Sequence, residues 1–457
     1  MTALFLRRCF SSSKLNPGPI LTQGPIRFDD PETAYSSYSS FELVRALGIY
    51  KACSVSPLVR NAEKLYKLSL RVGGSRLTHS ILKHSLFAHF CAGEDEYGLN
   101  LRMSKLSSIG VGCILDYAAE AGVVDASDHF EENTYNFLKA IDLASNSKSP
   151  VAVKISGLAP LKVLEQLTVA LSKSDFNFGR TLPNLEGLGL SSTVTFEVSE
   201  LLKRLDKICS LGKSRETPIL IDAEWTEVQG AIDYLAILMM NKFNRGGHQI
   251  ISTTYQCYLT SAPNRVKRDI SLAQKLQFSL CAKVVRGAYL VRERELGNSR
   301  VCPDAETTSM QYHSVLSELA RTDVVKWVLV ASHNETSIKE TIRLIQIYPS
   351  KFKFAQLLGM GDSLSFPLAS RKFQVYKYVP FGPVELVVPY LLRRAQENSS
   401  LMGSPQVSKE RELIVKELRR RFRAWASAWR DDVKSNSLSL FGRLSGQWDK
   451  IGLRVKL

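Results

Sequence analysis

The stretch VVKWVLVASH, residues 324–333, decides the fold class. It is a short run of β-branched and aromatic residues that ends in polar side chains, and a segment with helical periodicity, residues 335–347, follows it. Seven further runs share this character. They are GVGCILDY (110–117), PVAVKIS (150–156), PILIDAE (218–224), QIISTTYQCY (249–258), FSLCAKVVRG (278–287), FKFAQLLG (352–359) and QVYKYVPFG (374–382). Apolar β runs that alternate with helical segments indicate an α/β protein with a parallel sheet.

Eight such strands, each followed by a helix, close most naturally into a (β/α)8 TIM-type barrel. Helical spacing also predicts helices over 197–211, 228–241 and 309–321. A doubly wound open sheet is the alternative fold. It normally carries G-x-G-x-x-G after a strand, and the pairs Gly110/Gly112 and Gly359/Gly361 both lack the third glycine.

The element pattern divides the chain into four parts. Residues 110–400 form the barrel, with a polar, Gly-rich loop over 174–192 between the second and third strands. Residues 29–109 are expected to be additional N-terminal helices outside the barrel, with apolar-periodic pieces at 41–47 and 80–90. Residues 401–457 are expected to be a basic C-terminal helical extension and tail.

The first 28 residues have the composition of a mitochondrial transit peptide. They contain Arg7, Arg8, Lys14 and Arg27, three serines at 11–13, and no acidic residue before Asp29. We therefore expect cleavage near the end of this segment. No run reaches the roughly 18 apolar residues that a membrane-spanning helix needs, so membrane contact is expected to be peripheral.

The net charge of +16 permits an anionic partner. We expect no nucleic acid, because no helix-turn-helix, zinc-finger or aromatic-stacking motif accompanies the charge. The eight cysteines show no C-x-x-C pair and several fall inside apolar runs. They are interpreted as reduced core residues, which leaves neither a disulfide framework nor a metal site.

The strand ends gather polar and titratable residues. In a (β/α)8 barrel the catalytic groups lie at the C-terminal ends of the strands, where the βα loops build the open face. Such groups occur at almost every predicted strand end. They are Asp116, Lys154, Asp222, Glu224, Gln256, Arg286, Tyr289, His333, Gln356 and Tyr378.

The last βα unit carries an arginine pair. The segment PYLLRRAQEN, residues 389–398, has a proline that we place in the first turn of its helix. Tyr390, Arg393, Arg394 and Glu397 then share one helical face. Neighbouring guanidinium groups suit a carboxylate or a phosphate, and Glu397 can orient one of them. Taken alone, the pattern also fits a surface ion pair.

The chain resembles the proline dehydrogenases, also called proline oxidases, and is most similar to eukaryotic, plant-like members. The resemblance covers roughly residues 85–425 and rests on blocks that occur in order. They are HFCAGED (89–95), LIDAE (220–224), QCYL (256–259), KVVRGAYL (283–290), ASHNE (331–335), FAQLLGMGDSLSF (354–366), KYVPFGP (377–383) and PYLLRRAQEN (389–398).

The resemblance implies a (β/α)8 barrel that holds FAD noncovalently and oxidises L-proline to Δ1-pyrroline-5-carboxylate. Hydride passes to the flavin, and electrons then pass to ubiquinone on the matrix side of the inner mitochondrial membrane. The protein would thus catalyse the first step of mitochondrial proline catabolism.

Roles carry over residue by residue. Arg393 and Arg394 match the pair that binds the proline carboxylate, Lys154 adds a third positive charge, and Glu397 matches the glutamate that pairs with the arginines. The substrate wall matches Tyr289, Leu357, Tyr378 and Tyr390, and Asp222 matches the aspartate that sets the tyrosine wall. Flavin-contacting positions match Gln256, Lys283, Arg286 and His333.

Two positions depart from the bacterial pattern. Lys283 stands where bacterial members have arginine, so it lacks the bidentate contact, and Leu290 stands where they place tryptophan. The substrate amine must be neutral before hydride leaves, yet no buried base is evident in the sequence. Proton removal is therefore assigned to solvent.

Three other functions stay open. A hydroxyproline dehydrogenase would use the same flavin and arginine pair, although Tyr378 argues against it because hydroxyproline-selective relatives lack this tyrosine. A flavin-free barrel enzyme would use Lys154 as a Schiff-base nucleophile. A basic RNA- or membrane-binding scaffold would merely retain the barrel. Separately, the basic helix predicted over 409–430 either lies on an anionic bilayer, where it would aid quinone access, or caps the barrel.

Overall fold

A closed parallel barrel forms the centre of the molecule. The computed structural model describes residues 24, 26–117, 127–174, 176, 179, 181–401 and 405–450. Each strand pairs with the next, and the last pairs with the first, so the barrel has no open edge. All eight strands lie within the predicted runs. They are β1 Gly112–Tyr117, β2 Val151–Val153, β3 Ile219–Ile221, β4 Ile251–Gln256, β5 Leu280–Val285, β6 Val325–Ala331, β7 Phe352–Leu357 and β8 Val375–Phe381.

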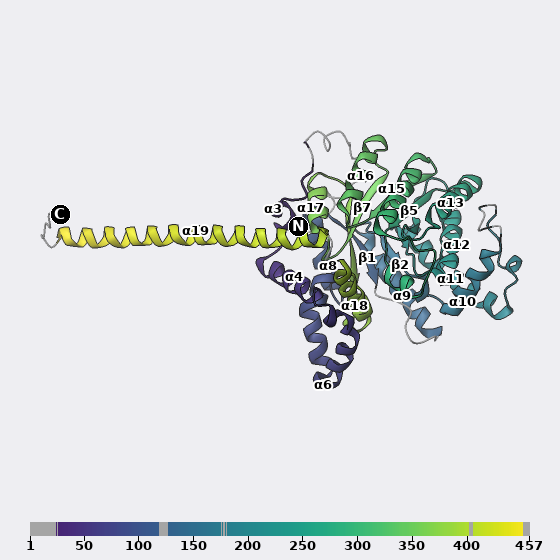
Figure 1. The fold of residues 1–457 in the computed structure, drawn as a ribbon, viewed down its shortest axis with the longest axis horizontal. Helices are drawn as coiled ribbons and strands as arrows, with labels where there is room; N and C mark the ends of the chain where they lie inside the picture. The colour runs from purple at the N-terminus through teal and green to yellow at the C-terminus, as the bar shows by residue number, and fades with distance from the viewer. Residues whose placement is uncertain are drawn as a thin grey trace.

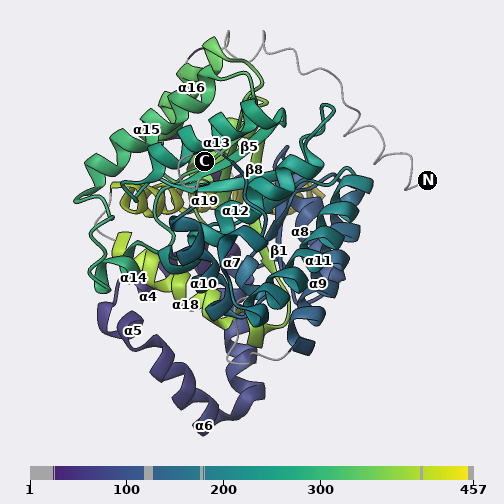
Figure 2. The same ribbon diagram turned by 90° about the vertical axis from the view of Figure 1, so that its right-hand side faces the viewer.

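Helices surround the barrel and extend from one side of it (Figures 1 and 2). Those between strands are α9 Ser127–Ser145, α10 Leu161–Ser172, α11 Ser192–Ser214, α12 Thr226–Phe243, α13 Ala262–Leu276, α14 Leu290–Glu295, α15 Ala305–Arg321, α16 Glu335–Ile347 and α17 Asp362–Ser370, with short 3-10 turns η2 Ile155–Gly157 and η4 Glu186–Leu188. The helices after β8 are α18 Val384–Leu401 and α19 Pro405–Lys450.

The N-terminal segment is helical, as predicted. Its elements are α3 Pro31–Tyr35, α4 Ser40–Cys53, α5 Ser56–Arg60, α6 Ala62–Leu82, α7 Ala88–Phe90 and α8 Glu96–Ser108. The apolar-periodic piece at 80–90 is helical throughout, although a π-helical turn, η1 Lys83–Phe87, separates α6 from α7. Residues 1–23 and 25 of the predicted leader lie outside the described residues, whereas Phe28 is buried in the main core.

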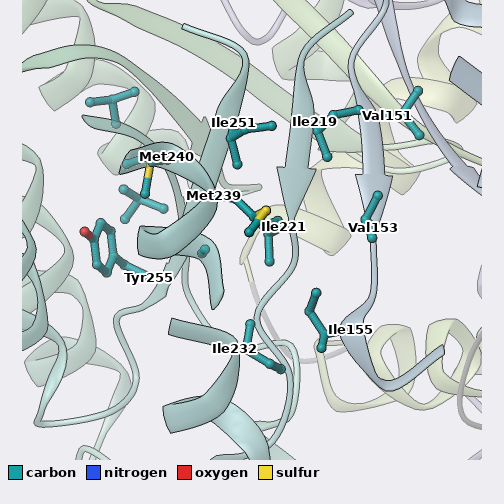
Figure 3. Close-up of a cluster of buried hydrophobic side chains, with 14 of the residues drawn as sticks. Val151, Val153, Ile155, Ile219, Ile221, Ile232, Met239, Met240, Ile251 and Tyr255 are labelled. Carbon is teal, nitrogen blue, oxygen red and sulfur yellow. The ribbon is translucent and has the colours of Figure 1, made fainter. Parts of the chain in front are cut away.

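The main core lies between the barrel and its helices (Figure 3). Outward-facing strand residues such as Val151, Ile219 and Ile251 pack with Ile232 and Met240 of α12 in one buried cluster. A fully buried aliphatic side chain contributes about 1.5–3 kcal/mol. The β-branched character of the runs is therefore explained by burial on both faces, which is typical of parallel sheets.

The barrel interior is a second, smaller apolar cluster. It contains Ile114, Ala152, Leu220, Cys281, Trp327, Leu329 and Ala355. Side chains alternate along a strand, so the residue two positions further on points into the same interior, nearer the C-terminal face. By that spacing the interior is continued by Asp116, Lys154, Asp222, Lys283, Leu357 and Tyr378. Strand parity therefore places these six residues, four of which are predicted strand-end groups, around one axis.

The first turns of α19 close against the N-terminal helices. Leu413 and Ile414 are buried in one cluster with Tyr35 and Leu43, and Glu410 accepts hydrogen bonds from Tyr50 (2.9 Å) and Ser363 (3.2 Å). Burial raises the pKa of Glu410. Beyond these turns the helix extends away from the body (Figure 1). Among the described residues no helix is long and apolar enough to span a membrane.

Gly359 tests how closely the N-terminal helices pack on the barrel. Its φ is +77°, and a Cβ there would lie 2.6 Å from the backbone oxygen of His89. We expect Gly359→Ala to lower the free energy of unfolding by about 2–5 kcal/mol, measured by urea denaturation, because backbone strain and overpacking add. Gly189→Ala is the control, since its φ is +64° with nothing within 4 Å. Equal losses in the two variants would contradict the close packing.

Candidate active site

The candidate site lies at the C-terminal face of the barrel, where several charged side chains are buried within the interior layer. Asp116, Lys154, Asp222 and Lys283 are each less than a tenth exposed. Buried charges are retained in proteins when they are paired or when they bind a ligand. The ion pairs that these four side chains form therefore indicate which charges the site presents to a ligand.

Asp222 joins strands β3, β5 and β8 at the mouth of the barrel. Its carboxylate forms an ion pair with Lys283 and accepts a hydrogen bond of 2.7 Å from the Tyr378 hydroxyl. The Lys283 ammonium also lies 5.3 Å from the centroid of the Tyr378 ring. Burial, together with the nearby carboxylates, raises the pKa of Tyr378 well above its ordinary value. Tyr378 therefore remains a hydrogen-bond donor, and its ring is held in one orientation.

Lys154 and Asp116 form a second buried ion pair in the interior. The Lys154 ammonium lies 3.3 Å from Oδ1 and 3.4 Å from Oδ2 of Asp116. A neighbouring carboxylate favours the ammonium form of lysine, which is not nucleophilic. This geometry therefore supplies a fixed positive charge and does not favour a Schiff base.

Helix α18 carries the arginine pair but does not start where the sequence pattern placed it. Gly382, with φ of 128°, and Pro383 end β8 and start the helix at Val384, so the prediction that Pro389 lies in the first turn was wrong. Pro389 sits inside the helix, where its missing N–H costs one hydrogen bond to the carbonyl of Glu385.

Two of the four residues that were predicted to share one face of α18 are buried. These are Tyr390 and Arg394, and the Arg394 guanidinium lies 5.0 Å from the centroid of the Tyr390 ring. Arg393 is half-buried. Glu397 lies in α18, but its side chain is outside what the structure describes. Burial of Arg394 argues against an ordinary surface ion pair, since arginine is rarely buried without a partner or ligand.

Gln256, at the end of β4, points a buried acceptor into the barrel end. Its amide nitrogen donates to the Glu224 carbonyl (2.6 Å) and lies 3.3 Å from the Tyr258 hydroxyl. Its oxygen Oε1 has no hydrogen-bond partner among the described residues. A buried oxygen without a hydrogen bond destabilises the fold unless a ligand donates to it. Gln256 therefore suits a bound group that carries an N–H.

His333 follows β6 as a neutral imidazole. Its Nε2 accepts a hydrogen bond of 3.0 Å from the backbone N–H of Leu357, so the hydrogen of the neutral ring is on Nδ1. Burial lowers the pKa of His333 to about 3, and the positive charges of Lys377 and Arg394 act in the same direction. The ring therefore offers a neutral N–H donor at physiological pH.

Arg286 and Tyr289 lie on the loop that follows β5. The Arg286 guanidinium donates to Ser337 (2.7 Å) and Ser309, and burial lowers its pKa. It thus lies between α15 and α16 and outside the interior layer. The Tyr289 ring packs edge-on against Trp225 at a centroid distance of 5.8 Å. The sequence had not singled out Trp225, although it follows the DAE block directly.

A buried ion pair behind β8 was missed from the sequence. Lys377 is 0% exposed and lies 2.6 Å from Oδ1 of Asp362, while Oδ2 of Asp362 accepts from Tyr38 at 2.8 Å. Lys377 also donates to the Met360 carbonyl at 2.6 Å. These bonds hold the loop that carries Leu357. A lysine at the centre of an apolar strand run was the available signal. The described residues include no cluster of metal ligands.

The pair formed by Lys283 and Asp222 gives a test of the site's construction. We expect Lys283→Met to lower the free energy of unfolding by about 3–5 kcal/mol, because it leaves a buried carboxylate without its cation. Lys283→Arg keeps the charge and should lose much less. Urea denaturation of both variants measures the difference, and a Met variant as stable as the Arg variant would contradict the ion pair.

Both the sequence and the fold of this chain are similar to those of known proteins. The family model described as "Proline dehydrogenase" matches residues 100–405. "Proline dehydrogenase 1, mitochondrial" of Dictyostelium discoideum is 34% identical over 443 residues, covering 88% of this chain and 77% of the relative. "Proline dehydrogenase 2, mitochondrial" of Arabidopsis thaliana is 32% identical, covering 87% and 90%.

Two further likenesses bear on specificity and on the fold. "Hydroxyproline dehydrogenase" of Xenopus laevis is 30% identical, covering 87% of this chain and 91% of the relative. The crystal structure of proline utilization A from Bdellovibrio bacteriovorus, inactivated by N-propargylglycine, superposes with a TM-score of 0.60 at 15% identity. The match covers 82% of this chain and 38% of that one. At this identity it shows a shared fold.

Proposed function

The chain belongs to the proline dehydrogenase family and is an oxidoreductase of that family, and we propose that it oxidises L-proline to Δ1-pyrroline-5-carboxylate with bound FAD. The observation that carries the proposal is the buried arrangement of cations and tyrosines at the barrel end. A small zwitterion needs positive charge at its carboxylate and an apolar or aromatic wall at its methylene groups. Arg393 and Arg394 supply the charge, and Tyr378 and Tyr390 supply aromatic surface.

The remaining residues assign an orientation to the substrate. Arg393 and Arg394 bind the carboxylate as neighbouring forks, and Lys154 adds a positive charge that Asp116 holds in place. Tyr378, fixed by Asp222, forms the wall with Tyr289, Leu357 and Tyr390. The family resemblance assigns Glu397 to pair with the arginines. Because most of these groups sit on barrel strands and on α18, and Lys154, Tyr390 and Arg394 are buried, they orient the ring and limit its contact with water.

The residues at the strand ends suit a flavin. Gln256 offers a buried acceptor for a ring N–H, His333 offers a neutral donor, and Lys283 and Arg286 provide positive charge. A flavin supplies hydride acceptance at its N5 position. Lysine at position 283 stays paired with Asp222 and gives one point charge where bacterial members have a fork.

The proton on the substrate amine leaves to solvent. Among the described interior carboxylates, Asp116 and Asp222 are both engaged by lysines, and Asp222 also accepts from Tyr378. Both carboxylates are thus already engaged by protein donors, so neither is assigned as the acceptor of the amine proton. Neutral proline therefore binds, or the bound amine loses its proton to solvent before hydride leaves.

Mitochondrial location and a ubiquinone acceptor complete the proposal. Several relatives carry "mitochondrial" in their names, and the first 28 residues have transit-peptide composition. Cleavage before Ile26 would preserve the packing of Ile26 and Phe28 on the main core. Ubiquinone is dissolved in lipid, so the enzyme works at the matrix side of the inner membrane. The first turns of α19 cap the body, and its exposed Trp425 and Trp429 lie beyond them.

The arginine helix provides the first test of the activity. Anaerobic L-proline should bleach the flavin absorption bands of the purified protein. In Arg394→Ala we expect kcat/KM for proline to fall by about 30-fold or more, equivalent to about 2 kcal/mol, since the carboxylate loses one partner of a buried charged pair. Arg343→Ala, at an exposed arginine of α16, is the control. Normal proline kinetics in Arg394→Ala would remove Arg394 from the site.

Tyr378 decides between proline and hydroxyproline. The two alternatives share the flavin and the arginines, and the relatives include both activities by name. Tyr378→Ser should lower kcat/KM for L-proline by about tenfold or more and raise the relative rate with trans-4-hydroxyproline, because the wall recedes. Tyr378→Phe keeps the ring and serves as the control for the hydroxyl. A wild-type preference for hydroxyproline would overturn the choice of substrate.

A further inference from the structure

A helical hairpin, residues 56–87 (α5, α6 and η1), stands out from the body of the protein. Both ribbon views show it projecting away from the barrel, as the lower helices of the picture (Figures 1 and 2). Within α6 only Thr78 is buried. Six large apolar side chains on the hairpin are between 41% and 82% exposed. They are Leu58, Leu65, Leu68, Val72, Leu77 and Ile81.

The hairpin is folded without a core of its own. Gly74, with φ of 71°, breaks α6 into two arms, and the Tyr66 ring stacks on His79 across them at 6.3 Å. The Tyr66 hydroxyl and the His79 Nε2 are 3.2 Å apart. Val72, which is 82% exposed, and Leu77 lie on either side of the reversal. The two helical arms therefore expose an apolar tip to solvent.

Positive charge surrounds this apolar surface. The hairpin contains six lysines and arginines against one acidic residue, Glu63, which pairs with Lys67. Arg71 and Arg76 flank the tip, two residues on either side of the Gly73–Gly74 turn. Exposed leucine and valine mixed with lysine and arginine is the composition of segments that lie in the interface of an anionic bilayer.

We propose that this hairpin is a lipid-docking element, which inserts its apolar tip between the headgroups of an anionic membrane. A stable protein interface buries about 800 Å² on each partner and is poor in lysine at its centre. Two large apolar side chains at the tip, Val72 and Leu77, with Lys64 and Lys67 on the first arm, fit such a partner poorly. Insertion to the boundary between headgroups and acyl chains needs only a few apolar side chains and cationic neighbours.

The root of the hairpin connects this surface to the candidate site. Val59, Leu82 and Phe87 pack in one cluster with Tyr390 and Leu357. His79 also lies 2.8 Å from Glu385 at the start of α18. A docked hairpin would therefore hold the arginine helix beside the lipid that dissolves the acceptor. The inference rests on the proposed function in this one respect, whereas lipid binding itself does not depend on it.

Co-sedimentation of the full chain with vesicles tests the proposal. Wild-type protein should bind vesicles of phosphatidylcholine with about one fifth cardiolipin more tightly than pure phosphatidylcholine, and salt should weaken the binding. Val72→Ser/Leu77→Ser should lower the partition coefficient by about tenfold or more, since two inserted side chains are lost. Arg71→Gln/Arg76→Gln should lower the preference for cardiolipin. Val169→Ser/Ile347→Ser, at exposed positions of α10 and α16, is the matched control.

The outcomes separate the hairpin from its rivals. Wild-type protein that does not bind cardiolipin vesicles, or a tip variant that binds within twofold of it, overturns the proposal. Loss of binding in Trp425→Ser/Trp429→Ser alone assigns the lipid contact to α19 and overturns it as well. A tip variant that changes the sedimentation-equilibrium mass without lipid identifies a contact between copies of the chain, again against the proposal.

A soluble electron acceptor separates the hairpin from the catalytic proposal. Every hairpin variant should reduce a dye with L-proline at the wild-type rate, which shows that it is folded. Reduction of ubiquinone embedded in the same vesicles should fall with the partition coefficient. Wild-type protein that binds vesicles but shows no proline-dependent dye reduction contradicts the proposed function and leaves lipid docking supported.

Discussion

Eight parallel strands in a closed barrel leave an interior that receives only every second side chain of each strand. The layer at mid-height is filled by Leu220, Trp327 and their neighbours, so it packs as a solid core. The next layer, two residues on, lies at or next to the C-terminal ends of the strands and faces the βα loops. Charged side chains are tolerated there because they pair across strands, as Lys154 does with Asp116 and Lys283 with Asp222. The site depends on this alternation of inward and outward side chains more than on any single loop.

The same alternation explains which parts of the structure could be predicted. Apolar runs identified all eight strands, and their polar ends identified Asp222 and Tyr378, because both signals are local in sequence. The start of α18 was misplaced since Pro389 suggested a first turn, while Gly382 and Pro383 were the stronger breaking signal. The bonding partners of these residues could not be predicted from the sequence. That Asp222 joins Lys283 and Tyr378 depends on barrel closure, which spacing along the chain does not encode.

The outward residues show a second limit. Arg286 and Lys377 belong to strand-end blocks, yet they lie outside the interior layer and bond to helices: Arg286 to Ser309 and Ser337, and Lys377 to Asp362. Their position outside the interior follows from the alternation of side chains only after the register of β5 and β8 is known. A polar residue at a strand end therefore has two possible environments. The residues of the family blocks include members of both kinds, so a motif alone does not separate contact with a ligand from support of the scaffold.

The packing of α3 and α4 against the first turns of α19 has a consequence for biosynthesis. Tyr35 and Leu43 complete their apolar cluster with Leu413 and Ile414, and Tyr50 bonds to Glu410, which is 360 residues away. Contacts of such long sequence separation form late, because the loop entropy must be overcome first. The cluster on α3 and α4 is therefore not complete until residues 410–414 of α19 have been synthesised. Until then Tyr35 and Leu43 lack the α19 side of their apolar cluster, so the nascent chain exposes apolar surface that the finished fold buries.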